Sequence, residues 1–458
     1  MSFLPHLAPF EVDFLSVSEG ACGSLMPEAR CRYSLPMPSV VLLNVVGLTP
    51  RLVPHAPSIA SVGRIMPMRG PLPAVTSTAQ ATMLTGTPPS RHGIVGNGWL
   101  FRDTMEVRFW PQSNRLIQTE TLYAPRRFTC AKMFWWFNQG APVDWFATPK
   151  PHYGADGSKV FAIVDGTGCD LERALGPFPF PAFWGPAAGL ASSDWIARAS
   201  AIVIEKNRPQ LTLVYLPHLD YDYQRCGPGD LERVREVDAC AKLVIDAARS
   251  IGAKVVAVSE YGLVPVKRAA YLNRELRRAG WLAVRDGPFG EQLDTFASKA
   301  FAVVDHQAAH LYVRDLPLEA VCDRLAPLAD RIVAPGEVGL DHPRSGDLIA
   351  LARPDEWFAY PYWLEDSRAP DFARTVDIHR KPGYDPCELF LTSKFRAARK
   401  LARKKLGFRY LMDVIPLDAG IVRGSHGLMT DPADGAVCVA ETPVPDMLDV
   451  RKLVLGLL

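Results

Sequence analysis

The 458-residue chain has no apolar run that approaches the roughly 20 residues needed to cross a bilayer, because charged residues interrupt every apolar stretch. It also lacks a strong charge of either sign: 51 Lys and Arg face 49 Asp and Glu, for a formal net charge of +2. This balance gives no reason to expect nucleic acid or a membrane as a partner. We therefore expect a globular protein with no transmembrane segment and no nucleic-acid ligand.

Paired cysteines are missing as well. The nine cysteines are odd in number and widely spaced, and none forms the C-x-x-C pair of zinc and redox sites. Reduced thiols fit this pattern, so we expect a cytoplasmic location. Residues 1–36 lack the basic and apolar regions of a secretory signal and show no sustained periodicity. They are predicted to be an N-terminal extension, either disordered or the product of a start codon assigned too early.

Three short aliphatic runs, at 40–46, 211–216 and 254–259, predict strands that are buried on both faces of a parallel sheet. Polar residues follow each run, at the end of the strand where open α/β sheets place their sites. Helical patterns at 194–205 and 230–250 alternate with the strands. The sequence therefore predicts an α/β fold with a doubly wound, mostly parallel sheet.

Residues 268–340 interrupt this alternation. A charged helix at 268–278 and a strand-like run at 309–313 predict a small inserted α+β subdomain. The main sheet is expected to resume at 346–352, so a single domain over 37–458 would contain the insertion.

Hydroxyl-bearing and small residues crowd the segment 73–94, which reads PAVTSTAQATMLTGTPPSRHGI and precedes Asn97. A strand, a sharp turn that carries Thr76 and a helix N-terminus require such residues. This geometry would expose one hydroxyl beside free backbone N–H groups, a suitable place for an anionic phosphoryl group. The alternative interpretation is a helix that is simply N-capped by Ser or Thr.

Seven landmarks follow one another along the chain: Val46-Gly47, the Thr76 segment with Leu84-Thr-Gly86 and His92-Gly-Ile94, Asn97, Asp220 with Gly227-Pro228, Ser259-Glu-Tyr-Gly262, Arg344-Ser-Gly-Asp347, and Gly424-Ser-His-Gly427. In this order they resemble the alkaline phosphatase superfamily, nearest its nucleotide pyrophosphatase/phosphodiesterase branch. The resemblance runs from about Val40 to the C-terminus. It implies an alkaline-phosphatase-like sheet and a phosphorylated small molecule as substrate.

The resemblance also implies a reaction. Thr76 would attack phosphorus and form a phosphoryl-enzyme intermediate, while Asn97 and the N–H of Ser77 would hold phosphate oxygens. Threonine is a poor nucleophile unaided, so a nearby cation that stabilises its alkoxide is the physical requirement. The implied activity is hydrolysis of a phosphoric ester, and the branch favours a diester or pyrophosphate over a monoester.

The family's metal ligands are only partly present. Its members hold two cations, usually zinc, with three Asp and three His besides the nucleophile. Asp220 and His426 match two of these ligands, and Glu260 can replace a third. The other three positions read Val46, Gln224 and Tyr261. We therefore expect one divalent cation rather than two, with zinc favoured and manganese or magnesium as alternatives.

The loop at 377–385 offers further candidates. His379 or Asp385 would supply a missing ligand, and Arg380 and Lys381 would hold substrate phosphate. The alternative interpretation is a solvated turn.

His218 and Asp222 flank Asp220. On an extended segment, alternation would place all three side chains on one side, which makes His218 another candidate ligand. His306 and His310 have the spacing of a helical metal pair, but the flanking residues favour a strand and structural histidines.

The segment 394–409 holds eight basic residues between apolar ones. A helix of this kind meets anionic lipid or nucleic acid, although we favour a solvated amphipathic face. Because several family ligands are replaced, two other functions stay open. The site would transfer a phosphoryl group to an acceptor other than water, or would bind a phosphorylated metabolite or a partner protein without catalysis.

Overall fold

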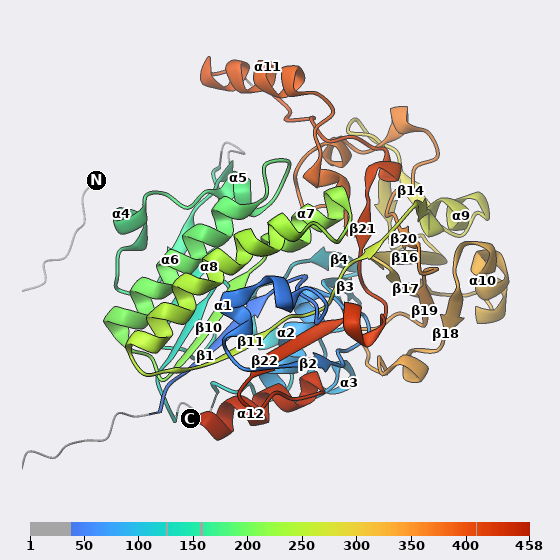
Figure 1. Cartoon of the computed structure of the whole chain (residues 1–458). Helices are drawn as coiled ribbons and strands as arrows, with labels where there is room; N and C mark the ends of the chain where they lie inside the picture. Colours follow the sequence, from blue (N-terminus) through green and yellow to red (C-terminus); the bar gives the residue numbers. More distant parts are fainter. Residues whose placement is uncertain (1–37, 125–126, 156–158, 409) are drawn as a thin grey trace, which may run out of the picture. The chain divides into compact units, whose positions relative to one another are not determined.

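The structure is a computed structural model that describes residues 38–458 apart from 125–126, 156–158 and 409. The predicted extension 1–36 lies outside the described residues. An eight-stranded sheet forms the centre of residues 38–458, in the order β2-β22-β11-β1-β10-β5-β6-β9 (Figure 1). Its strands are β1 (Val40–Val45), β2 (Arg64–Met68), β5 (Cys130–Met133), β6 (Trp145–Pro149), β9 (Ile163–Asp165), β10 (Leu211–Leu216), β11 (Lys254–Val258) and β22 (Ala436–Ala440).

The three predicted aliphatic strands are neighbours at the centre of this sheet. β1 pairs in parallel with β10 on one side and β11 on the other, and every residue of β1 is buried. β5 and β6 continue the parallel order, whereas β22, β2 and β9 are antiparallel to their neighbours. The mostly parallel sheet is confirmed. The polar residues that follow each predicted strand lie at the carboxyl end of that strand, as expected.

Two long helices cover the central strands. α6 (Leu190–Asn207) and α8 (Leu231–Ser250) lie side by side across the sheet, which Figure 1 shows in green. Both helices were predicted, and the carboxylate of Asp230 caps α8 by accepting the N–H of Glu232. α12 (Val450–Leu457) packs on α2 (Thr76–Thr85) and reaches β1.

A second sheet has the order β16-β17-β19-β18. Its strands are β16 (Ala300–Asp305), β17 (Ala308–Val313), β18 (Arg331–Val333) and β19 (Leu348–Leu351). β17 confirms the strand expected at 309–313. The expected return of the main sheet at 346–352 is wrong, because β19 pairs with β17 and β18, and the main sheet resumes only at β22.

The segment 268–278 is not one helix. It begins as β13 (Arg268–Ala270), which pairs in parallel with β20 (Glu356–Phe358), and continues as α9 (Leu272–Arg278). The other helices are α1 (Pro57–Ala60), α3 (Pro89–His92), α4 (Leu171–Leu175), α5 (Phe180–Phe183), α7 (His218–Cys226), α10 (Leu318–Leu325) and α11 (Lys394–Lys405). Two-stranded pairs are β3 (Gly98–Phe101) with β4 (Glu106–Phe109), β7 (His152–Tyr153) with β8 (Lys159–Val160), β12 (Val264–Pro265) with β21 (Gly424–Ser425), and β14 (Ala283–Arg285) with β15 (Gln292–Asp294).

The seven cysteines among the described residues are free thiols. No helix in the described ranges is both long enough and apolar enough to span a membrane.

Candidate active site

Thr76 is the first residue of α2, and its hydroxyl does not cap the helix. Val75 occupies the N-cap position in an extended conformation, and no side chain caps this end. The capping interpretation of Thr76 is therefore wrong. Its Oγ1 lies 2.9 Å from the hydroxyl oxygen of Tyr261, and the residue is only 3% exposed. The hydroxyl thus sits at a helix N-terminus, where the helix dipole favours negative charge.

The predicted phosphate-binding groups lie beside Thr76. The N–H of Ser77 donates to Oδ1 of Asn97 at 2.9 Å. Asn97 in turn donates to the carboxylate of Asp305, through its backbone N–H at 2.7 Å and its Nδ2 at 3.1 Å. Burial raises the pKa of Asp305 to about 6, although the two hydrogen bonds from Asn97 lower it. A phosphate oxygen would have to replace Asp305 as the acceptor of the Asn97 amide.

Asp220 lies in α7, which follows β10. One helical turn places Gln224 on the same face, and its Nε2 donates to Oδ2 of Asp220 at 2.7 Å. The Tyr384 hydroxyl donates to Oε1 of Gln224 at 2.8 Å and fixes that amide. Burial raises the pKa of Asp220 to about 7, and the bond from Gln224 lowers it. The carboxyl group is therefore poised between its two protonation states near neutral pH.

Glu260 follows β11 and is fully buried. Its Oε1 accepts hydrogen bonds from Nδ2 of Asn44 at 2.6 Å and Nε2 of Gln80 at 2.7 Å. Burial raises the pKa of Glu260 to about 8, and hydrogen bonds from Gln80, Asn44 and Thr76 lower it. Without a positive charge beside it, this group is protonated at neutral pH.

His426 faces Asp220. Its Nδ1 lies 2.7 Å from the carbonyl oxygen of Ala74, so Nδ1 carries the proton and Nε2 carries a lone pair. Nε2 lies 3.6 Å from Oδ1 of Asp220. Burial lowers the pKa of His426 well below its ordinary value, which keeps the imidazole neutral. A neutral imidazole with a free Nε2 is the form that binds a cation.

His306 also reaches this site, although we expected it to be a structural residue. It occupies the turn between β16 and β17 with a left-handed φ of +62°. Its ring stacks on Tyr384 at 3.7 Å and on His426 at 3.7 Å, and His426 stacks on Tyr261 at 3.6 Å. His310 lies on β17 and bonds the carbonyl oxygen of Val95 at 2.9 Å. The rings of Tyr384, His306, His426 and Tyr261 thus form a continuous row across the site.

A small cavity of about 40 Å³ lies among these groups. Its walls include Thr76, Asp220, Tyr261, His306, Tyr384 and His426, together with other aromatic side chains. A groove of about 780 Å³ elsewhere on the described surface contains none of the predicted site residues. We place the site by its chemistry, because the larger groove offers no comparable group of buried titratable side chains.

The donor atoms for one cation are present and unused. Oδ1 of Asp220, Oε2 of Glu260 and Nε2 of His426 are buried and have no hydrogen-bond partner among the described residues. The 3.6 Å between the Asp220 oxygen and the His426 nitrogen is close to the separation of roughly 3.4 Å that zinc ligands at about 2.0–2.1 Å show in a tetrahedral site. Two carboxylates and one imidazole are ligand types that suit a single divalent cation, but the ligand atoms of all three do not lie within 4.8 Å of one another, so Glu260 would have to move toward Asp220 and His426 to complete the site.

The positions where the resemblance implies the remaining ligands offer little to a second cation. Val46 offers no ligand atom, the Gln224 amide is bonded to Asp220, and the Tyr261 hydroxyl is bonded to Thr76. These three residues stand where the resemblance implies further ligands. Gln224 and Tyr261 use their polar atoms in hydrogen bonds within the protein.

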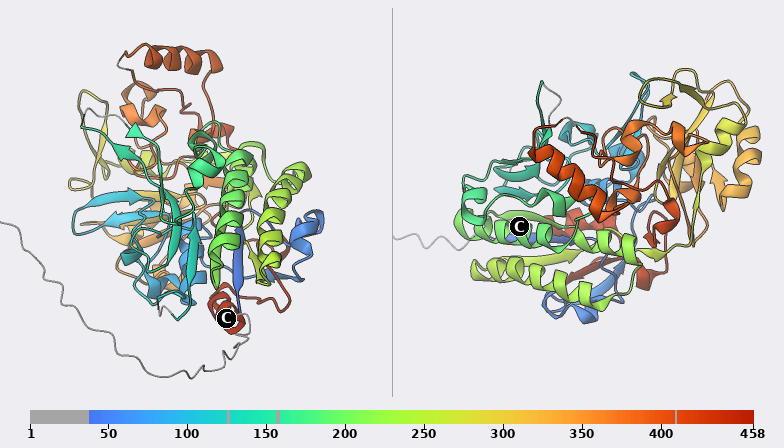
Figure 2. Two further views of the ribbon diagram at one scale, coloured as in Figure 1. Left: turned by 90° about the vertical axis from the view of Figure 1, so that its left-hand side faces the viewer. Right: turned by 90° about the horizontal axis from the view of Figure 1, so that it is seen from above.

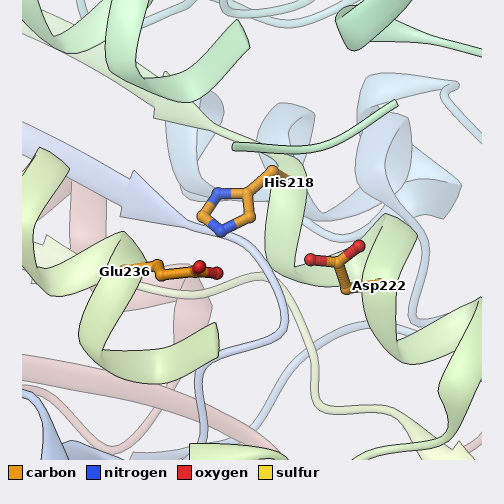
Figure 3. Close-up of side chains that lie close together, drawn as sticks. All are labelled: His218, Asp222 and Glu236. Carbon is orange, nitrogen blue, oxygen red and sulfur yellow. The ribbon is translucent and has the colours of Figure 1, made fainter. Parts of the chain in front are cut away.

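His218 does not join the Asp220 site. Because α7 is helical, His218 and Asp222 share the face opposite Asp220, and the expectation of an extended segment is wrong. Figure 3 shows His218 between Asp222 and Glu236, and ligand atoms of these three lie within 4.8 Å of one another. Asp220, Glu260 and His426 do not all meet that limit.

The carboxylates beside His218 are already balanced by cations. Arg225 lies 2.6 Å from Asp222, and Arg233 lies 2.8 Å from Glu236 and 3.5 Å from Asp222. A divalent cation would have to displace both guanidinium groups, so this cluster is an ion-pair network between α7 and α8.

The loop 377–385 reaches the cavity through Ile378 and Tyr384 rather than through its charged residues. Nδ1 of His379 lies 3.2 Å from the carbonyl oxygen of Phe109. Arg380 lies 3.5 Å from the carboxylate of Asp371 and is exposed. Neither residue lines the cavity.

Lys381 is buried between two carboxylates, Asp385 and Glu388, with Nζ 2.7 Å from each. This ion-paired group holds the loop in place, and it leaves neither the ammonium nor Asp385 pointing into the cavity.

Sequence patterns carry little signal for His306 and Tyr384 as members of this site. Their rings come from segments far from Thr76 in the chain, and only the fold brings them together. Two hints were available for His306: its spacing from His310, and its place directly after the buried strand β16, because sites gather at strand ends.

Comparisons with known proteins agree with this architecture. The family model described as "Type I phosphodiesterase / nucleotide pyrophosphatase" matches residues 40–385. The structure of phosphonoacetate hydrolase from Sinorhizobium meliloti 1021 with phosphonoformate is similar at 13% identity and a TM-score of 0.57, covering 92% of this chain and 95% of that one. Murine ectonucleotide pyrophosphatase/phosphodiesterase 5 shows 12% identity and a TM-score of 0.54, with 92% and 94% coverage. Its inactive variant in complex with AMP shows 13% identity and a TM-score of 0.53, with 92% and 94% coverage. No curated protein matches the chain by sequence.

Proposed function

The chain belongs to the type I phosphodiesterase/nucleotide pyrophosphatase family, and on that premise we propose that it cleaves a phosphoric ester by attack of Thr76 on phosphorus. A diester or pyrophosphate is the preferred substrate class, as in the family's name. The similar structures hold phosphonoformate or AMP, which carry a phosphonate or phosphate group. The observation that carries the proposal is the Thr76 hydroxyl, which caps nothing and points at Tyr261 beside the unused atoms of Asp220 and Glu260.

The residues around Thr76 divide the work of the attack. Burial raises the pKa of Tyr261 well above its ordinary value, so its phenol stays protonated and orients the Thr76 oxygen as a hydrogen-bond donor. The ionised Glu260 carboxylate lies beside the same hydroxyl and, as a hydrogen-bond acceptor, orients it. The Thr76 proton is lost to water before the attack, because a ligand of the cation must stay ionised. The new bond joins Thr76 Oγ1 to phosphorus, and the ester oxygen of the leaving group departs in line.

The phosphoryl oxygens would be held by the N–H of Ser77 and the amide of Asn97, at the N-terminus of α2. On binding, these donors exchange their present acceptors, Asn97 and Asp305, for phosphate oxygens. Lys381 and Arg380 are left out of this role, because they lie in ion pairs away from the cavity.

Asp220, Glu260 and His426 would hold one divalent cation, with zinc favoured over manganese or magnesium for a set that includes imidazole. When bound, such a cation supplies positive charge that stabilises the Thr76 alkoxide and keeps both carboxylates ionised. The proposal assigns no ligand role to the other three candidates. His379 contacts the carbonyl oxygen of Phe109, Asp385 pairs with Lys381, and His218 lies beside Asp222 and Glu236.

One observation favours a second candidate. Gln224 and Tyr261 bond to Asp220 and Thr76, so the family groups that would activate a hydrolytic water are replaced. Phosphoryl transfer from Thr76 to an acceptor other than water is therefore the alternative reaction at the same residues.

The test compares two threonines of α2. Thr76→Val removes the nucleophilic oxygen and keeps the shape, whereas Thr78→Val removes a buried hydroxyl that has no hydrogen-bond partner among the described residues. With bis-p-nitrophenyl phosphate and zinc or manganese, we expect Thr78→Val to keep wild-type release of p-nitrophenol and Thr76→Val to lose it. Equal rates in the two variants would refute the assignment of Thr76. Turnover that appears only when an alcohol acceptor is added would favour transfer over hydrolysis.

A further inference from the structure

Helix α11 stands off from the rest of the described chain. Figure 1 shows it at the top in orange, joined to the body by two stretches of chain, and the left view in Figure 2 shows the same separation. It spans Lys394–Lys405, and the N–H of Leu406 donates to the carbonyl of Ala402 at 3.1 Å, so Leu406 continues the last turn of the helix.

The segment around α11 is unusually rich in exposed apolar side chains. Six of the fourteen large apolar side chains that are exposed in the described chain fall between 391 and 411. They are Leu391, Phe395, Leu401, Leu406, Phe408 and Leu411. The most exposed are Phe395 at 79% and Leu406 at 73%. Such a concentration in a short segment marks a surface that meets an apolar partner.

The helix turns an apolar stripe outward. Phe395, Ala398, Ala402 and Leu406 follow one another at intervals of three and four residues, the spacing of one helical face, and all four are exposed. A solvated amphipathic helix of a globular protein buries this stripe, so the solvated-face interpretation does not account for its direction.

The opposite side of α11 holds the helix to the body. Arg396 and Lys400 both pair with Asp413, the latter at 2.6 Å, and Ala397 packs against a buried apolar cluster that contains Val414 and Ile415. The outward direction of the apolar stripe is therefore fixed by contacts on the other face.

The charge of the segment has one sign. Residues 389–412 contain eight basic residues and no acidic one. Lys394, Arg399, Arg403 and Lys405 are exposed and form no ion pair within the described part of the chain. The guanidinium of Arg403 lies 5.8 Å from the ring of Phe408, beside the apolar stripe. The face combines unpaired cations with exposed aromatic and aliphatic side chains.

We propose that this face of α11 docks on an anionic lipid bilayer, with the helix lying in the plane of the interface. A basic amphipathic helix with Phe and Leu on its apolar face binds bilayers in this way, by placing the apolar face at the acyl boundary and the cations at the head groups. Nucleic acid would account for the cations but not for the aliphatic side chains between them. The inference is independent of the proposed activity, because it uses none of the residues around Thr76.

The test uses flotation of the full chain with vesicles of phosphatidylcholine and with vesicles of equal parts phosphatidylcholine and phosphatidylglycerol. We expect binding to the anionic vesicles to be at least about tenfold stronger, since each basic residue near an anionic surface contributes roughly a fivefold factor. Raising the salt to about 0.5 M should weaken it, because the Debye length shortens.

Three double variants separate the contributions. Phe395→Ser with Leu406→Ser removes the apolar stripe, and Arg399→Gln with Arg403→Gln removes two cations; both should lose about tenfold or more in binding. The matched control is Phe289→Ser with Phe296→Ser, which removes apolar side chains that are 64% and 62% exposed outside this face and should bind like the wild type. All six positions are exposed, so unchanged thermal unfolding is expected.

Equal binding to the two vesicle types, or wild-type binding by both α11 variants, would overturn the proposal. Binding to a DNA duplex that survives Phe395→Ser with Leu406→Ser, with no flotation, would assign the surface to nucleic acid and would also overturn it.

Discussion

The two buried carboxyl groups beside Thr76 predict that the metal-free protein loses stability between pH 5 and pH 7 relative to a variant in which neither group titrates. Burial raises the pKa of Asp220 to about 7 and that of Glu260 to about 8, whereas both groups titrate near 4 in the unfolded chain. The folded state therefore binds more protons than the unfolded state across this pH range. A group of this kind stabilises the fold fully below its unfolded pKa, and the contribution is lost as the pH rises through its folded pKa.

The magnitude follows from the proton difference. Each group changes the free energy of unfolding by about 1.4 kcal/mol per pH unit while it is protonated only in the folded state. Glu260 stays in that condition throughout the range, and Asp220 leaves it near pH 7. Together they lower the free energy of unfolding by on the order of 4 kcal/mol between pH 5 and pH 7. A bound divalent cation reverses the trend, because it requires both groups to be ionised.

The assay is urea unfolding followed by tryptophan fluorescence, at several pH values from 5 to 7, with a chelator present. The matched control is Asp220→Asn with Glu260→Gln, which keeps the shapes and removes both titrations. This control is needed because desolvation lowers the pKa of five buried histidines, which change stability in the opposite direction as the pH rises toward the unfolded histidine pKa of about 6.5. They are His92, His218, His306, His310 and His426. We expect the wild type to lose stability relative to the variant as the pH rises, and added zinc to reverse the difference. Parallel profiles for the two proteins would refute the inference that these carboxyl groups are buried without a compensating charge.

Two further substitutions test separate parts of the account. Tyr261→Phe removes the 2.9 Å bond to Thr76 and should lower the turnover number about tenfold with little change in KM, as measured by steady-state kinetics with a phosphodiester; an unchanged turnover number would exclude the orienting role. Lys381→Met leaves Asp385 and Glu388 buried without their cation and should lower the free energy of unfolding by about 3–5 kcal/mol in urea titrations. A loss below about 1 kcal/mol would show that these carboxylates are not dependent on Lys381.

The central sheet was predictable because its strands are buried on both faces. A parallel strand in that position must be aliphatic throughout, so β1, β10 and β11 stand out from their neighbours in the sequence. The start of α8 was equally readable, since Asp230 carries a capping carboxylate at the boundary. Local chemistry alone determines both features.

Sheet membership was not predictable in the same way. The buried run in β19 looks like another strand of the main sheet, but it pairs with β17. Burial sets the composition of such a run and does not specify its partner, because pairing depends on contacts between residues far apart in the sequence.

Site residues that directly follow a strand could be predicted, whereas residues that reach the site only through stacking of their rings could not. Asp220 and Glu260 were expected from their positions after β10 and β11. His306 and Tyr384 were not, because their roles depend on stacking against each other and on His426. The helical form of α7 separates His218 from Asp220. This helix was not predicted, because the short polar stretch after Pro217 shows no clear hydrophobic periodicity.

The measurement that tests the central claim most directly is detection of a covalent adduct on Thr76. The protein would be mixed with bis-p-nitrophenyl phosphate and a divalent cation, quenched in acid during turnover, and analysed by peptide mass spectrometry. The account predicts a phosphoryl adduct on the peptide that contains Thr76 and none in Thr76→Val. Product release by both proteins without any adduct would contradict it.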